Sequence, residues 1–132
     1  MIGRGVSAGD DRGSSPVEFV LVGALLTVLT LGVLQFGLVV YVRNVVHDAA
    51  VEGAYRAALA DETVADGVAR TRALITRAVG PAYAREVTGD EVVMGGAPAV
   101  RITVQAPLPL VGLLGAPRTL EVSADAPAES FD

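Results

Sequence analysis

The sequence predicts an α+β fold in which one long apolar helix continues into a small domain with a second helix and a short antiparallel sheet. Three observations carry this prediction. Residues 19–42 form an apolar run without a charged residue. Small residues then recur at three- and four-residue spacing up to about residue 59, which is the period of a helix face. From Glu86 onward, apolar and polar residues alternate instead, which is the period of a strand.

The composition narrows the class of protein. With 132 residues the chain holds one small domain at most, yet 52% of the residues are apolar and only 5% are aromatic. A small core cannot bury so many apolar residues, so a membrane segment is predicted. The absence of cysteine from the sequence excludes a disulfide framework, a thiolate metal site and a thiol nucleophile. A net charge of −5 without a basic stripe argues against nucleic acid as a partner.

The apolar run at residues 19–42 is long enough for a transmembrane helix, because a bilayer core requires about 20 apolar residues. Tyr41 and Arg43 stand where an interfacial aromatic ring and a snorkelling cation are expected. A secretory signal peptide is the competing interpretation, but its apolar core is usually about 7–15 residues and follows a basic stretch. Here the flank at residues 10–12 is Asp-Asp-Arg. A retained membrane helix is therefore favoured, and arginine counting does not fix its orientation.

Glu18 is unusual because it places a carboxylate at the start of the apolar run, where an unpaired charge is costly. One interpretation is a helix start, with Ser15 as N-cap, Pro16 as first helical residue and Glu18 closing a capping box. That interpretation gives the local structure but no reason for an acid at the membrane edge.

The residues around Glu18 also form a spaced motif. Gly13 is followed by four uncharged residues, then Glu18 and Phe19, then the long apolar helix. This pattern resembles the type III signal of type IV pilin-like proteins. The resemblance implies a leader at residues 1–13, cleavage between Gly13 and Ser14 by a prepilin peptidase, and subunit contacts through Glu18 and Phe19. In that family the glutamate is thought to pair with the N-terminal amine of a neighbouring subunit.

The resemblance extends further along the chain, where the sequence is similar to the TadE family. The residues that carry it are Gln35-Phe36-Gly37, Tyr41, Arg43-Asn44, Ala49-Ala50 and Glu52–Ala58. The sequence departs from the family pattern at Gln35, where an acid is more usual, and at Tyr55, which precedes Arg56.

The TadE resemblance implies a minor pilin or pseudopilin that takes part in assembling a tight-adherence (Flp, type IVb) pilus or a related secretion system. Its implied partners are a prepilin peptidase, other pilin or pseudopilin subunits, the assembly platform and the membrane. The implied location is the cell membrane as a single-pass protein, with a cytoplasmic N-terminus and an extracytoplasmic C-terminal domain, or the pilus itself.

Two other classes of function are open to the same sequence. One is an uncleaved single-pass membrane protein whose extracytoplasmic domain binds a partner. The other is a small membrane enzyme, which the sequence disfavours because it contains no nucleophile–base pair, phosphate loop or metal-ligand cluster. His47 with Asp48 and Glu52 is a poor metal site, because adjacent helical residues diverge. We therefore expect no catalytic residues, no metal and no cofactor.

The long helix is expected over residues 14–60, with its transmembrane part at 19–42. Beyond the membrane, a small-residue stripe on one face predicts a packing interface, and Glu52 is expected to pair with Arg56 one turn later. The stripe consists of Val46, Ala49, Ala50, Gly53, Ala54, Ala57 and Ala58.

A second helix is expected within residues 61–80, from Val64 to Val79, started by Asp61 or Thr63 and ended by Gly80-Pro81. Its predicted apolar side comprises Val68, Leu74, Ile75, Ala78 and Val79. The cluster Arg70, Arg72 and Arg77 is interpreted as a solvated face in preference to a site for an acidic partner.

Residues 81–132 are expected to form the small antiparallel β region. A hairpin turns at residues 95–98, and a third strand begins near Thr119. A helix must cover such a sheet for it to be stable. The apolar, proline-punctuated stretch 107–117 has three open interpretations: packing on the long helix, contact with a partner, or contact with the membrane. The tail at residues 126–132 is expected to fray.

Overall fold

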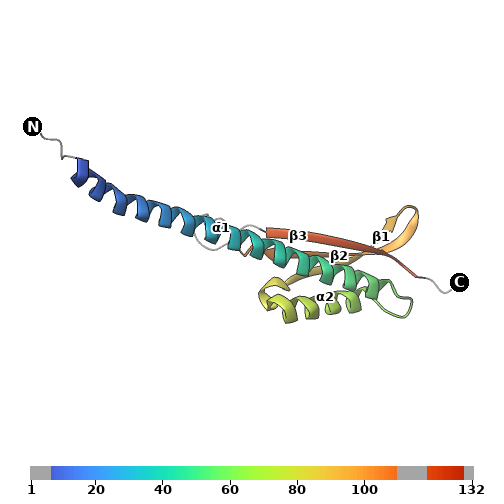
Figure 1. The fold of residues 1–132 in the computed structure, drawn as a ribbon. Coiled ribbons are helices and arrows are strands. Elements are labelled where there is room, and N and C mark those ends of the chain that lie inside the picture. The colour runs from blue at the N-terminus through green and yellow to red at the C-terminus, as the bar shows by residue number, and fades with distance from the viewer. Residues whose placement is uncertain (1–6, 110–118, 130–132) are drawn as a thin grey trace, which may run out of the picture. The chain divides into compact units, whose positions relative to one another are not determined.

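The computed structural model describes residues 7–109 and 119–129, with side chains described from Ser14 onward (Figure 1). It confirms the predicted α+β, pilin-like fold: a long N-terminal apolar helix, a second helix and a three-stranded antiparallel sheet. The chain divides into two compact units, Met1–Gly37 and Leu38–Asp132. Helix α1 (Ser7–Ala58) contributes residues to both units.

Within the second unit, the predicted small-residue stripe of α1 is confirmed as an internal packing face. All seven of its residues are buried, and Val42 extends the face by one turn. Because most of these side chains are alanine or glycine, neighbouring elements can approach the α1 backbone closely. The helix packs against its own chain here.

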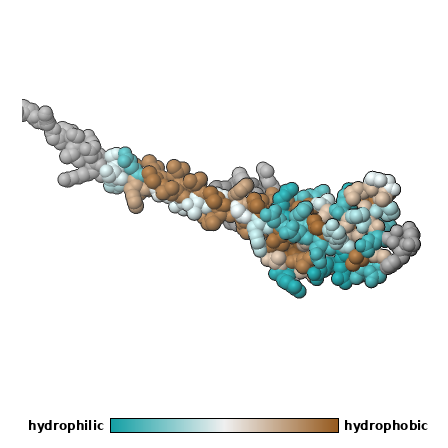
Figure 2. Space-filling view, turned by 45° about the vertical axis from the view of Figure 1, so that its right-hand side comes forward, coloured by the Kyte–Doolittle hydropathy of each residue, from teal (hydrophilic) through white to brown (hydrophobic). Residues whose placement is uncertain are grey.

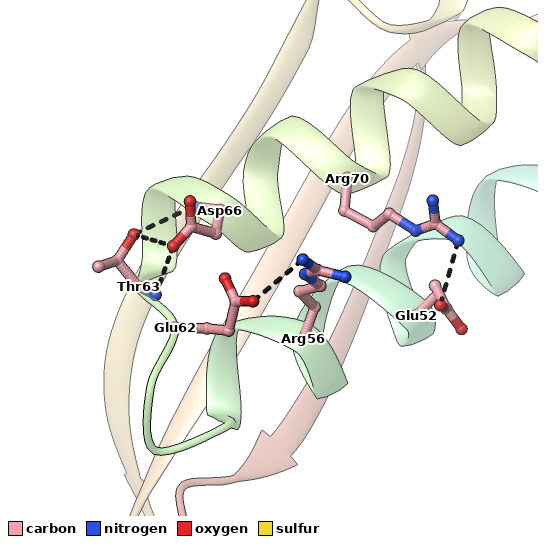
Figure 3. Close-up of polar contacts among 6 residues, drawn as sticks. All are labelled: Glu52, Arg56, Glu62, Thr63, Asp66 and Arg70. Carbon is pink, nitrogen blue, oxygen red and sulfur yellow. Dashed lines mark hydrogen bonds and ion pairs between the residues drawn. The ribbon is translucent and has the colours of Figure 1, made fainter.

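Helix α2 (Val64–Val79) begins and ends where the sequence predicts. Of the two predicted starts, Thr63 is the N-cap: its hydroxyl accepts a hydrogen bond from the Asp66 backbone N–H at 3.2 Å, and its own N–H donates to Asp66 Oδ2 at 2.8 Å (Figure 3). The Thr63 N–H and the Thr63 hydroxyl both donate to Asp66 Oδ2 at 2.8 Å, and these two bonds hold the pKa of Asp66 below its usual value. Gly80 ends the helix with φ of 109°, which favours glycine, and the short 3₁₀ helix η1 (Pro81–Tyr83) follows.

The crossing of α1 and α2 joins Gly53 of the predicted stripe to two residues of α2, Gly67 and Thr71, that the sequence pattern did not indicate. A Cβ at Gly67 would lie 2.5 Å from the Gly53 carbonyl oxygen, so both positions leave room only for hydrogen. Thr71 is fully buried, and its hydroxyl donates to the carbonyls of Gly67 at 2.9 Å and Ala49 at 3.3 Å. The prediction of Ala78 on the packed side is wrong, since Ala78 is exposed. The sequence pattern missed the α2 side of this crossing, because a single glycine and a threonine give no apolar periodicity.

The expected ion pair between Glu52 and Arg56 is also wrong. Glu52 instead pairs with Arg70 on α2 at 3.5 Å, and Arg56 pairs with Glu62 in the following loop at 3.0 Å (Figure 3). Each side chain reaches an opposite charge on a neighbouring segment. Both pairs are partly exposed, so each contributes at most about 1 kcal/mol.

The three predicted strands are β1 (Glu86–Met94), β2 (Ala97–Pro107) and β3 (Thr119–Pro127), in the order β1-β2-β3. The hairpin turn between β1 and β2 uses Gly95 and Gly96 with φ of 59° and 82°, a left-handed backbone that favours glycine at both positions. One face of the sheet is buried and includes the alternating apolar residues Val100, Ile102, Val104, Leu120, Val122 and Ala124. Both helices supply apolar residues to the same core.

The opposite face of the sheet is polar and paired across the strands. Arg101 donates twice to Asp125, from Nε at 2.7 Å and from Nη2 at 2.9 Å. These hydrogen bonds hold the pKa of Asp125 below its usual value and raise that of Arg101. Thr103 meets Ser123 at 3.2 Å, and the Gln105 amide donates to Glu121 at 3.0 Å. This face therefore satisfies its own hydrogen bonds.

The structure corrects the expectation that the tail frays from residue 126. Ala126 is buried in the last part of β3, and the Ala128 N–H donates to the Pro98 carbonyl at 3.0 Å. The Glu129 N–H donates to the Ala58 carbonyl at 2.8 Å, which satisfies an otherwise unpaired acceptor at the end of α1. Of the apolar stretch 107–117, residues 110–117 lie outside the described residues, while Leu108 packs on the core.

Candidate processing and assembly site

The predicted site residues lie on α1, on the first turns whose side chains the structure describes. Ser14 and Glu18 are one helical turn apart, and the Ser14 hydroxyl donates to Glu18 Oε1 at 3.4 Å. Both side chains are exposed, as is Phe19, which leaves 80% of its surface uncovered. The carboxylate of Glu18 therefore reaches back toward the residue that the sequence analysis expects as the new N-terminus.

The predicted helix start at Ser15 and Pro16 is wrong for the described chain. Helix α1 begins at Ser7, and Pro16 lies inside it. A proline inside a helix has no N–H to donate to the carbonyl four residues earlier, here that of Arg12. Gly13 lies in the same turn, and glycine costs a helix about 1 kcal/mol relative to alanine. The helix around the Gly13–Ser14 peptide bond therefore has low intrinsic stability.

The residues after Glu18 present an apolar surface that nothing in their own unit covers. Large apolar side chains from Val17 to Leu34 are all at least 55% exposed, and Phe36 is 71% exposed. Figure 2 shows this brown, apolar surface along α1 and mainly hydrophilic residues over the second unit. Among the described residues, α1 is the one helix long and apolar enough to cross a membrane. Soluble proteins rarely expose such a surface, which indicates a membrane anchor.

The TadE-like protein family matches residues 13–54. The resemblance inferred from the sequence motifs is therefore confirmed over this segment. TadE-like proteins are linked to the assembly of tight-adherence pili. The chain matches none of the curated proteins and none of the solved structures with which it was compared.

The family match lies entirely within α1. The match begins at Gly13, the residue before the expected new N-terminus, and ends at Ala54 within the buried stripe. It thus covers Glu18, the exposed apolar surface and the first part of the packing face. Helix α2 and the sheet lie outside it.

The other charged residues of the described chain do not gather into a second centre. His47 Nδ1 lies 3.8 Å from Asp48 Oδ1, and both side chains are largely exposed. Among residues 14–109 and 119–129, no group of three or more His, Asp and Glu side chains is placed to hold a metal. The arginine cluster is divided, since Arg70 pairs with Glu52 while Arg72 Nη2 donates to the Val87 carbonyl at 3.4 Å.

Proposed function

We propose that this chain is a minor pilin or pseudopilin of a tight-adherence pilus or a related secretion system, and that a prepilin peptidase cleaves it between Gly13 and Ser14. One observation carries the proposal. The Gly13-to-Glu18 spacing comes directly before the part of α1 whose large apolar side chains are exposed, and it lies inside the segment that matches the TadE-like family.

Local helix chemistry supports cleavage at this bond. A peptidase needs an extended backbone at the bond that it cuts, and Gly13 with Pro16 makes this turn of α1 easy to open. The leader would remain on the cytoplasmic side of the membrane, and the second unit would lie outside the cytoplasm.

Cleavage would create a cationic amine at Ser14, one turn from the carboxylate of Glu18. A carboxylate at the membrane edge is costly unless it is paired, and an amine supplies both the opposite charge and hydrogen-bond donors. In the assembled pilus, Glu18 would pair with the amine of a neighbouring subunit, while Phe19 and the apolar side chains after it pack between helices.

The first experiment determines the N-terminus of the protein purified from its native membrane, by intact mass and terminal sequencing. We expect the mature chain to begin at Ser14. A chain that begins at Met1 or Ile2 would contradict the proposal and favour an uncleaved membrane protein with a partner-binding domain. A start beyond residue 45 would identify the apolar run as a signal peptide.

Two variants test the motif residues. Gly13→Leu should leave the full-length precursor in the membrane, whereas Gly9→Leu, a matched change within the leader, should be processed normally. Glu18→Ala should be cleaved at Ser14 yet impair pilus assembly. Normal pili with Glu18→Ala would show that Glu18 has no role in assembly.

A further inference from the structure

The described arginines of the second unit fall into two groups. Four of them bond to other residues of the chain, namely Arg56, Arg70, Arg72 and Arg101. The other three, Arg43, Arg77 and Arg85, are exposed, and no described residue forms an ion pair or hydrogen bond with their side chains. Single unpaired arginines are common on protein surfaces, so the position of these three decides what they indicate.

Arg43 and Arg77 lie at the same level along the two helices. Helices α1 and α2 run antiparallel in the second unit (Figure 1), and the Thr71 hydroxyl donates to the Ala49 carbonyl. Arg43 precedes Ala49 by six residues, and Arg77 follows Thr71 by six residues. At about 1.5 Å per residue, both arginines are displaced from this contact by about 9 Å in the same direction.

Arg85 lies toward the same end of the second unit. A Cβ at Gly89 would lie 2.5 Å from Val64 Cγ1, at the start of α2, whereas the Val87 carbonyl is reached by Arg72. Earlier residues of β1 therefore lie beside later residues of α2. Arg85 precedes Gly89 by four residues, which places it about 10–13 Å nearer to the last turn of α2.

These arginines surround the place where α1 enters the second unit, which we call the entry end (residues 38–43 of α1). Leu38 and Tyr41 of the entry end are 42% and 53% exposed, and they belong to the apolar run 19–42. The headgroup layer of a bilayer extends about 5–8 Å beyond each side of its apolar core. When the apolar run spans a membrane, Arg43 and the residues level with it lie in that layer.

Acidic side chains without a partner are found at the opposite end. Glu91 and Glu129 line one cavity together with the last residues of α1, and neither carboxylate has a partner among the described residues. Three acids are nearer to the arginines, namely Asp48, Glu86 and Glu121, and they follow the entry end on the side away from the apolar run. The second unit therefore has unpaired cations at the entry end, although the whole chain carries a net charge of −5.

We propose that the entry end of the second unit binds anionic phospholipid headgroups through Arg43, Arg77 and Arg85 and thereby holds the unit against the bilayer. A guanidinium group donates paired hydrogen bonds to a phosphate, and an anionic membrane surface attracts each cation within a Debye length. The same surface repels the acids of the opposite end, which gives the unit one preferred orientation. The proposal requires α1 as a membrane anchor and does not require cleavage at Gly13.

The test measures how close the entry end lies to lipid headgroups. The sequence contains no cysteine, so one introduced cysteine gives a single site for a fluorophore. Ala82→Cys labels the exposed η1 segment between Arg77 and Arg85, and Ala97→Cys labels the hairpin at the opposite end as a control. The full chain is inserted into phosphatidylcholine vesicles with or without phosphatidylglycerol, both containing a headgroup spin-labelled lipid. We expect phosphatidylglycerol to increase quenching of the Ala82→Cys label and to leave the Ala97→Cys label unchanged.

Matched variants test the arginines in the phosphatidylglycerol vesicles. Arg77→Gln and Arg85→Gln should each lower the ratio of membrane-bound to released second unit by about fivefold, measured by quenching of the Ala82→Cys label. Arg77→Lys should keep most of the quenching, because the positive charge remains. Arg56→Gln removes the same charge away from the entry end and is the control, for which we expect unchanged quenching. Circular dichroism checks that each variant folds.

Salt distinguishes a lipid surface from a site for a free anion. Sodium chloride should release the second unit by screening, and sodium phosphate at the same ionic strength should release it equally. Stronger release by phosphate would show that the site takes a free anion and would overturn the proposal.

Two other results would also overturn the proposal. They are equal quenching of the Ala82→Cys label in the two lipid mixtures, and unchanged quenching when Arg77→Gln and Arg85→Gln are combined. Flotation of the vesicles reports whether α1 anchors the chain, and terminal sequencing reports cleavage at Gly13. A failure of the anchor or of processing is thus distinguished from a failure of headgroup binding.

Discussion

The two parts of α1 differ in side-chain size and in what covers them. Residues 14–37 carry large apolar side chains such as Leu25 and Leu29, which are 67% and 60% exposed. Residues 38–58 carry mostly small ones on their packed face, and Ala50 and Ala54 are fully buried. The apolar side chains of residues 38–58 are removed from water by packing against the same chain. Those of residues 14–37 need a cover from outside the chain.

The space around the glycines differs in the same way between the two parts of α1. A Cβ added at Gly23, Gly32 or Gly37 would meet nothing within 4 Å. A Cβ added at Gly53 would collide with the Thr71 side chain and lie 2.7 Å from the Gly67 carbonyl oxygen. The second part of α1 is thus adapted to its own chain. The first part requires a partner or solvent that the chain does not supply, which is how a membrane anchor behaves.

The largest expected effect comes from a charge in the first part. Leu29→Arg should remove the protein from the membrane fraction, because an arginine at the centre of a membrane helix costs about 2.5–3.5 kcal/mol. The measurement is retention in membranes after an alkaline carbonate wash. Asp48→Arg, at an exposed position of the second part, is the control and should be retained. Equal retention of both variants would argue against a membrane-spanning role for residues 19–42.

The next effect concerns the glycines. Gly53→Ala should lower the free energy of unfolding by about 2–3 kcal/mol, since the new methyl group must displace Thr71 or separate the helices. Gly32→Ala should change it by less than about 1 kcal/mol, because nothing lies nearby. Denaturant unfolding of the full chain in detergent measures both values. Similar stabilities would show that α1 and α2 do not approach closely at Gly53.

A smaller effect is expected for a matched pair of threonines. Thr71→Val removes the buried hydroxyl that bonds Ala49 and Gly67, and should cost about 1–2 kcal/mol. Thr27→Val removes a hydroxyl that donates to the Gly23 carbonyl at 2.8 Å on the exposed surface, and should be nearly neutral. The same unfolding measurement applies. If Thr27→Val lowers the free energy of unfolding as much as Thr71→Val, the two parts of α1 do not differ in how their side chains are packed.

The smallest expected effect is a loss of folding stability at low pH, which arises from two aspartates of the second unit. The pKa values of Asp66 and Asp125 are lowered in the fold, so the stability they contribute is complete above the ordinary aspartate pKa. It is lost as the pH falls below about 3.8 and through the lowered values. Melting temperatures measured between pH 6 and pH 2 should therefore fall mainly below pH 4. Asp125→Asn should make the decrease in melting temperature smaller. An equal decrease in this variant would show that Asp125 does not contribute to it.

Sequence reasoning succeeded where one segment carries the whole signal. The apolar run at residues 19–42, the cap at Thr63, the stop at Gly80 and the alternation in β2 and β3 each depend on near neighbours along the chain. It failed where two segments meet. Arg56 pairs with Glu62 and not with Glu52, because the competing partner becomes near only after the chain turns.

By itself, the sequence determined the kind and order of the elements, the apolar surface of α1 and the Gly13-to-Glu18 spacing, because periodicity and spacing are local properties. Only the tertiary structure decided that Gly53, Gly67 and Thr71 form the helix crossing and that residues 126–129 are held by hydrogen bonds and burial. The physical reason is that close packing and hydrogen-bond phase depend on which distant residues meet, and a local pattern carries no record of that.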